Sequence, residues 1–341
     1  MEVTVLDGQL RPVKVIDTFR SLIWTKRYYT CGDFELYLPA DRELLQYKPD
    51  GSGTDYFLSR SDDDSVMVIE KIAIQTDAEN GDYFIISGRS LESILARRIV
   101  GSQTIIKSED VVQGLKELVA DWTSYIDLTI DDSLTVAHDL ITQITGDVLL
   151  DAVSAICMRF GIGLKMTISE SAFRLAFYQG DEVNVIFSPE FDNLISSKYV
   201  YDITNYANYV KVMGEGTGMN RIAVHINRPP QVLGVGSRQI YADARDISRN
   251  DGSVSQIDYL PMLLERGWEK LAEHEVTETF EAEINPERPF AYKRDWNLGD
   301  IVTVTNEYGI TAKPRIVEII ECWDENGYTA IPKFDALEVQ A

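Results

Sequence analysis

The sequence predicts an α+β fold that is mainly antiparallel β, with a strand-rich module at each end. Apolar residues alternate with period two through the first hundred and the last sixty or so residues. In both places a tryptophan precedes a Gly-Asp corner and a half-buried strand: Trp24 precedes Gly32-Asp33, and Trp296 precedes Gly299-Asp300. The section between them shows helical spacing instead. Two similar β modules around a middle section are more typical of a scaffold than of an enzyme.

Length and composition set the broad class. A chain of 341 residues predicts roughly two or three domains, and 45% hydrophobic residues are enough for sizeable cores. No apolar run approaches the roughly 20 residues that span a bilayer, and the first residues read as a strand and not as a secretory leader. We therefore expect synthesis and folding in the cytoplasm, with no membrane partner. Cys31, Cys157 and Cys322 are too few and too dispersed for a disulfide framework or a metal site.

The charge balance is strongly acidic. There are 55 acidic and 32 basic residues, a formal net charge of -23. Such a chain repels phosphate backbones, so nucleic-acid binding is not the expected main function. Two interpretations stay open: an acidic surface that keeps the protein soluble, or an acidic lumen through which nucleic acid slides without adhering.

Residues 1–100 are expected to form the first β module. Phe34, Leu36 and Leu38 share one face of a strand. A later strand is expected to place four residues inward, namely Val66, Val68, Ile72 and Ile74. A turn at Asn80-Gly81-Asp82 predicts a hairpin, and a short helix follows at about 90–99.

Residues 101–200 are expected to form a small α/β domain. Ser108 is a plausible N-cap for a helix that ends near Trp122. A second helix runs from about Asp147 to Arg159 and stops at Gly161. A hairpin over about 164–178 completes this domain.

Residues 201–341 are expected to form a second β module, a small barrel or curled sheet. Strands at 208–214 and 221–227 flank a glycine-rich turn. A helix at about 258–274 lies in a helical insertion spanning about 228–275. A closing meander is expected over four strands, at about 279–284, 301–305, 315–323 and 328–331.

Histidine and glycine motifs give no catalytic site. The three histidines are His138, His225 and His274, and the alternation of its strand places His225 toward solvent. His274-Glu275 resembles half of a zinc-protease helix, but Glu278 stands where the second histidine is required. The glycines of residues 214–218 follow a strand as a phosphate loop does. The Lys-Ser/Thr of a P-loop is missing, however, so a hairpin turn is favoured.

Acidic residues give no site either. Asp62, Asp63 and Asp64 are carboxylates that could hold a hard cation, but their spacing is not that of a calcium loop, so a solvated loop is favoured. No Gly-x-Ser-x-Gly elbow occurs. We therefore assign no catalytic, cofactor or metal residues and expect no enzyme activity. Tyrosines are abundant, which suits protein–protein contacts as well as half-buried strand edges.

Several ordered blocks resemble a tail-hub family of phages and prophages with long, non-contractile tails. The blocks cover roughly residues 15 to 335, and their order is more specific than any one of them. They are Trp24-Thr-Lys-Arg-Tyr with Gly32-Asp33-Phe34-Glu-Leu, Ser87-Gly88-Arg89-Ser-Leu91 with Leu95-Ala-Arg97-Arg98-Ile99, Tyr241-Ala-Asp243-Ala-Arg245-Asp246, and Tyr292-Lys-Arg-Asp295-Trp296-Asn-Leu298-Gly299-Asp300 with Arg315-Ile-Val-Glu318.

The resemblance implies a structural protein at the distal end of the tail, similar to the baseplate hub of contractile phages. In such hubs each subunit has two tube-type β-barrel modules, and three subunits form a ring of six modules. For this chain the resemblance implies a homotrimer in the virion tail, assembled in the host cytoplasm. Its partners would be the tail tube or distal tail protein, the tape measure protein, and a fibre or tip protein. DNA would be transient cargo in the channel.

Two functions of other classes remain as alternatives. The chain could be a tail-associated cell-wall hydrolase, which requires a cleft with convergent titratable groups. It could also be a carbohydrate-binding protein that recognises the host wall. Release of peptidoglycan fragments would reveal the first, and retention on intact host cells would reveal the second.

Overall fold

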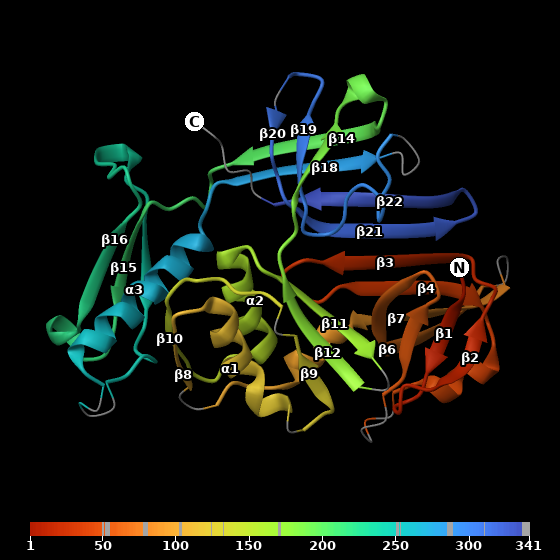
Figure 1. Ribbon diagram of the computed structural model, residues 1–341, viewed down its shortest axis with the longest axis horizontal. Helices are drawn as coiled ribbons and strands as arrows, with labels where there is room; N and C mark the ends of the chain where they lie inside the picture. Colours follow the sequence, from red (N-terminus) through yellow and green to blue (C-terminus); the bar gives the residue numbers. More distant parts are fainter. Residues whose placement is uncertain are drawn as a thin grey trace.

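The computed structural model describes residues 1–49, 51, 55–77, 81–101, 104–123, 125–131, 133–169, 172–249, 252, 254–284, 289–309 and 311–335 (Figure 1). The predicted mainly antiparallel β fold with few helices is confirmed. Part of the expected turn at Asn80 lies outside the described residues. No helix in the described ranges is long and apolar enough to cross a membrane.

One antiparallel layer runs through both ends of the chain (Figure 1). Each strand in it is antiparallel to its neighbours. Pairing of β3 (Ser21–Arg27) with β21 (Ile316–Asp324) joins the N-terminal and C-terminal modules edge to edge. In spatial order the strands are β6 (Asp63–Asp77), β7 (Gly81–Ser90), β4 (Asp33–Pro39), β3 (Ser21–Arg27), β21 (Ile316–Asp324), β22 (Gly327–Phe334), β18 (Thr277–Ile284) and β14 (Leu194–Asp202).

The N-terminal module curls around its own core. The sheet continues from β6 through β5 (Phe57–Arg60) and β1 (Val3–Leu6) to β2 (Pro12–Ile16), and a 3-10 helix, η1 (Arg42–Tyr47), lies beside it. The predicted common face of β4 is confirmed, since its three apolar residues are at most 3% exposed. The core also contains Leu22, Trp24, Phe84 and Ile86.

The prediction for β6 is wrong in part, because this strand separates two cores. Val66 and Val68 are buried on one side, against the middle domain, as expected for an inward face. Met67 and Ile69 are buried on the other side, in the N-terminal core. A register shift after Ile69 then changes the pairing with β7, and Ile74 is 51% exposed.

The middle section contains the predicted helices and hairpin. Helices α1 (Val111–Thr123) and α2 (Leu149–Phe160) pack on a common core, and Gly161 ends α2 in a left-handed conformation with φ 61°. The short predicted helix is 3-10 helix η2 (Leu91–Arg97). The strands are β8 (Thr104–Ser108) with β10 (Leu140–Ile144), and β11 (Gly163–Ser169) with β12 (Ala172–Tyr178) and β9 (Leu128–Ile130).

The expected closing meander is wrong in its pairing. Strand β19 (Ile301–Thr305) pairs with β20 (Thr311–Ala312) and, in parallel, with β13 (Glu182–Phe187). These three strands form a separate sheet, with η3 (Pro189–Phe191) leading from β13 toward β14. Phe187 and Trp296 are buried between this sheet and the long layer. The alternation of β19 suits either sheet, so only long-range packing decides its partner.

Residues between β14 and β18 form a unit with its own core. Strands β15 (Tyr209–Met213), β16 (Ala223–Asn227) and β17 (Gln239–Asp243) form a sheet that helix α3 (Gln256–Ala272) covers. Short 3-10 turns η4 (Gly218–Asn220) and η5 (Gly234–Gly236) connect the strands. We expected 208–227 to belong to the C-terminal module, with only 228–275 inserted. These bounds stay a prediction; in the structure, helix α3 covers the apolar face of β15 and β16.

Closed barrels are not found in the described strand pairings, which give open strand orders. The boundaries 1–100, 101–200 and 201–341 remain predictions. The sheet memberships favour moving the start of the last module to β13, because β13 and β14 pair with C-terminal strands.

Candidate functional site

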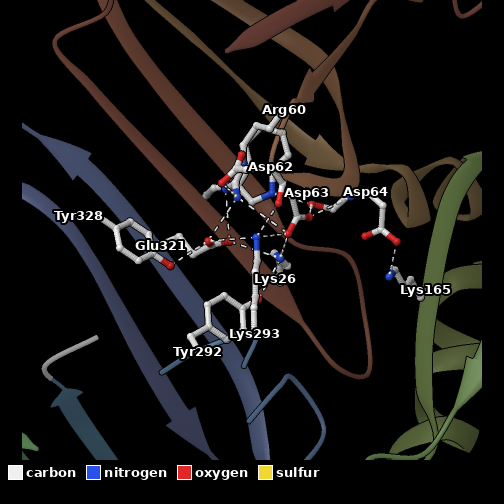
Figure 2. Close-up of polar contacts among 12 residues, drawn as sticks. Lys26, Arg60, Asp62, Asp63, Asp64, Lys165, Tyr292, Lys293, Glu321 and Tyr328 are labelled. Carbon is white, nitrogen blue, oxygen red and sulfur yellow. Dashed lines mark hydrogen bonds and ion pairs between the residues drawn. The ribbon is translucent and has the colours of Figure 1, made fainter. Parts of the chain in front are cut away.

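The seam between the terminal modules, where β3 pairs with β21, is a densely ion-paired region of the described chain. Six residues of β21 pair with six of β3, from Glu318 opposite Arg27 to Trp323 opposite Leu22. On the core side of this seam, charged side chains from four segments meet (Figure 2). Their cations are Lys26, Arg60 and Lys293, and their carboxylates are Asp62, Asp63 and Glu321. We call these six residues the seam cluster.

Glu321 and Arg60 form the most deeply buried pair of the seam cluster. Their side chains are 1% and 0% exposed, and Nη1 of Arg60 lies 3.2 Å from Oε2 of Glu321. The hydroxyl of Tyr328 donates to Oε1 of Glu321 at 3.1 Å. The Arg60 guanidinium lies 4.9 Å from the ring centre of Trp24 and 4.3 Å from that of Trp323. Both modules therefore enclose this arginine.

Asp63 is the second anionic centre of the seam cluster. Its Oδ2 lies 2.5 Å from Nζ of Lys26 and 2.6 Å from Nζ of Lys293. Burial raises the pKa of this carboxyl, but attraction and hydrogen bonding from Lys26 outweigh burial, so the net pKa is well below its usual range. The expected solvated loop is wrong for Asp63, whose side chain is 5% exposed. Asp64 points away and pairs with Lys165 (Figure 2).

The arrangement suits joining the modules better than catalysis. Each carboxylate of the seam cluster already faces a cation of the protein, and burying opposite charges together avoids an unpaired buried charge. Within the described ranges, no group of three or more His, Cys, Asp or Glu side chains is placed to hold a metal. The seam cluster thus fixes the relative position of β3, β6 and β21.

A cavity of about 650 Å³ borders the seam cluster where the middle domain meets both terminal modules. Its lining includes Lys26, Asp63 and Lys293 of the seam cluster and Glu92 of η2. Burial raises the pKa of Glu92, which accepts a hydrogen bond from the Met166 backbone at 2.7 Å. The polar lining belongs to three modules, so it depends on their correct docking.

The histidines and the glycine-rich turn that were considered as candidate sites are not brought together in the structure. His225 is exposed on β16, as predicted, while His274 contacts the Asn205 carbonyl at 2.9 Å and His138 that of Asp139 at 2.9 Å. Gly214 and Gly216 lie in the connection of the antiparallel β15 and β16, which confirms the hairpin. Arg221 donates to the Gly214 carbonyl at 2.8 Å.

Sequence reasoning missed Arg60, Lys293 and Glu321. One pattern could have revealed Glu321: it occupies an inward position of β21, between Ile319 and Trp323. A carboxylate on the apolar face of an alternating strand requires a buried partner. The partner itself, 261 residues away, has no local pattern.

Residues 2–334 match the family described as siphovirus ReqiPepy6 Gp37-like protein. The chain belongs to this family. The match covers the whole of the long layer, including both sides of the seam, and confirms the expected kinship with proteins of siphoviruses. No curated protein matches the chain closely enough to count as a relative.

Solved structures show that this Gp37-like chain has the fold of tail proteins. The 43 kDa tail protein of prophage MuSo2 from Shewanella oneidensis is 13% identical, covers 98% of both chains and has a TM-score of 0.63. The tail protein from Neisseria meningitidis MC58 is 15% identical over 98% of this chain and 96% of its own, with a TM-score of 0.61. The c3393 protein of E. coli is 10% identical over 98% and 77%, with a TM-score of 0.51. It is described as a type VI secretion component similar to the T4 tail proteins gp27 and gp5.

Replacing Asp63 of this Gp37-like chain by Asn is expected to lower stability in a pH-dependent way. A carboxyl with a lowered folded-state pKa contributes stability above its unfolded pKa, near 4, and loses it as the pH falls further. We expect Asp63→Asn to cost roughly 3 kcal/mol at pH 7. The difference from wild type should shrink below about pH 4. Urea unfolding at several pH values measures it, with the more exposed Asp62→Asn as control; a difference that persists unchanged at pH 3 would contradict the assignment.

Proposed function

We propose that this protein is a non-enzymatic structural hub of a phage or prophage tail. In this role it links the tail tube or distal tail protein to the tip or fibre apparatus and surrounds a channel for DNA. The shared fold with tail proteins over 98% of the chain supports the tail assignment. The observation that carries the hub assignment is the continuous layer across the seam, because it joins two β modules side by side.

The layer has two edges that favour a ring. Beyond Ile69, β6 pairs with β7 alone among the described residues, and β14 pairs with β18 alone. The eight strands alternate in direction, so β6 and β14 run opposite to each other. Copies joined head to tail would therefore continue an antiparallel sheet and leave no open edge. We propose a homotrimer, with two tube-type barrel modules from each copy.

The charge of the channel is expected to be mixed. The face of the layer opposite the seam cluster carries both signs side by side, for example Arg27 between Asp33 and Glu318. If this face lines the channel, the residues that make the chain acidic overall lie mainly outside the channel. We therefore do not propose an acidic lumen, and the acidic composition fits the simpler role of keeping the protein soluble.

Light scattering on the purified full-length chain tests the proposal. At high concentration we expect a species of three times the 38.5 kDa chain mass that dissociates on dilution. The same protein should release no fragments from host peptidoglycan. A chain that stays monomeric at every concentration and digests peptidoglycan would support the cell-wall hydrolase instead.

A further inference from the structure

A row of alternating charges crosses all eight strands of the layer. It contains one charged residue from each strand, and its described side chains lie on the face opposite the seam cluster. Neighbouring members are ion-paired or directly opposite in the strand register. From β6 to β14 the row is Glu70, Arg89, Asp33, Arg27, Glu318, Lys333, Glu281 and Lys198.

In the N-terminal half of the row, and across the seam to β21, the opposite charges lie close together. Nη2 of Arg89 lies 2.7 Å from Oε1 of Glu70, and Arg89 is opposite Asp33 in the register of β7 and β4. Nη1 of Arg27 lies 2.6 Å from Oδ2 of Asp33, and its Nε lies 2.5 Å from Oε2 of Glu318. The two modules thus already meet through a pair of opposite charges in this row.

The C-terminal half of the row follows the same rule. Nζ of Lys333 lies 2.8 Å from Oε1 of Glu318. Glu281 occupies the register position between Lys333 on β22 and Lys198 on β14. Opposite charges on neighbouring strands stabilise a sheet, and like charges destabilise it.

The two free edges of the layer therefore carry opposite charges. Glu70 is at the β6 edge, just beyond the residues of β6 that pair with β5. Lys198 is at the β14 edge. We infer that Lys198 of one copy pairs with Glu70 of the next copy and continues the alternation around the ring. This inference rests on the proposed hub function and names the contact that assembles it.

The row also selects against other ways of joining copies. Two β14 edges that paired with Lys198 opposite its own equivalent would bring like charges together, and so would two β6 edges that paired with Glu70 opposite its own equivalent. Like charges at such a contact disfavour closed two-fold dimers. Head-to-tail joining is the arrangement that brings opposite charges together, and it is also the arrangement that forms rings.

Charge reversal at each edge tests the contact. We expect Lys198→Glu and Glu70→Lys each to weaken ring formation on the order of tenfold per contact. The double variant should recover the part of this loss that arises between copies, because it restores opposite charges there with the net charge unchanged. The like charges that Glu70→Lys places beside Arg89 within a copy remain. Lys107→Glu is the matched control: it makes the same charge change at an exposed ion pair with Asp258, outside the layer. Sedimentation equilibrium of the full-length chains measures association, and circular dichroism confirms that each variant is folded.

The outcomes separate this contact from the hub function. Single reversals that weaken association, with recovery in the double variant, support the contact. A wild-type trimer that neither reversal affects would overturn the Lys198–Glu70 pairing and leave the hub function standing. A loss in both single variants that the double variant does not recover would also overturn the pairing. A wild-type chain that is monomeric at all concentrations would overturn the ring and the contact together.

Discussion

Replacing Glu321 by Gln is expected to lower the stability of the protein by about 3–5 kcal/mol. The substitution keeps the size of the side chain and removes its charge, so Arg60 loses its most deeply buried partner. It keeps Asp62 at 3.2 Å, a side chain that is 41% exposed, and Asp63 at 3.9 Å. Removing one partner of a buried ion pair is costly because the other charge cannot return to water. Lys26 loses a second carboxylate at 3.3 Å. The midpoint of urea unfolding, followed by tryptophan fluorescence, measures the loss.

Glu318→Gln provides the matched control for this prediction. Glu318 lies on the same strand, three residues away, and also contacts an arginine and a lysine. Its cations are more exposed, at 33% and 41%, so water replaces much of the lost attraction and the cost should be about 1 kcal/mol or less. Equal losses of stability in the two variants would show that the buried ion pairs of the seam cluster stabilise the protein no more than exposed ones do.

Replacing Gly299 by Ala is expected to cost roughly 3 kcal/mol or more. Gly299 has φ +97°, a conformation that is unfavourable for any residue with a side chain. An added Cβ would lie 2.3 Å from Cε2 of Tyr28. Tyr28 is fully buried, and its hydroxyl donates to the carbonyl of Gly161 or Tyr178 at 3.2 Å, so its ring cannot move aside without losing these contacts.

Gly309→Ala separates the steric clash from the backbone strain. Gly309 also has positive φ, +77°, but an added Cβ there meets no atom within 4 Å. We expect this variant to cost only about 1 kcal/mol, from the backbone term alone. Thermal unfolding of both variants gives the comparison. Similar losses would mean that Tyr28 does not hold the Gly-Asp corner in place.

Local features of the fold were predictable because they depend on nearby residues. The alternation of Phe34, Leu36 and Leu38 identifies the core face of β4, and Gly161 identifies the end of α2. These features follow from the period of each element and from the conformational freedom of glycine. The same reasoning predicted α3 and the hairpin at Gly214.

Sheet membership was not predictable in the same way. Strand β19 pairs in parallel with β13, more than a hundred residues earlier, and nothing in its alternating sequence names that partner. The seam cluster was not predictable for the same reason. Asp63 is buried by Lys293 of the C-terminal module and by Lys26 of β3, and both are distant in sequence. Charged residues in polar segments are solvated by default, and only the tertiary fold shows otherwise.

Hydrogen–deuterium exchange tests the ring most directly, since edge amides exchange until a strand covers them. We expect assembly to slow exchange in residues 70–76 of β6 and 194–202 of β14 together, while exchange in the edge strand β2 stays unchanged. An assembled oligomer in which these two segments exchange as fast as in the monomer, with protection at β2 or β9 instead, would contradict this expectation.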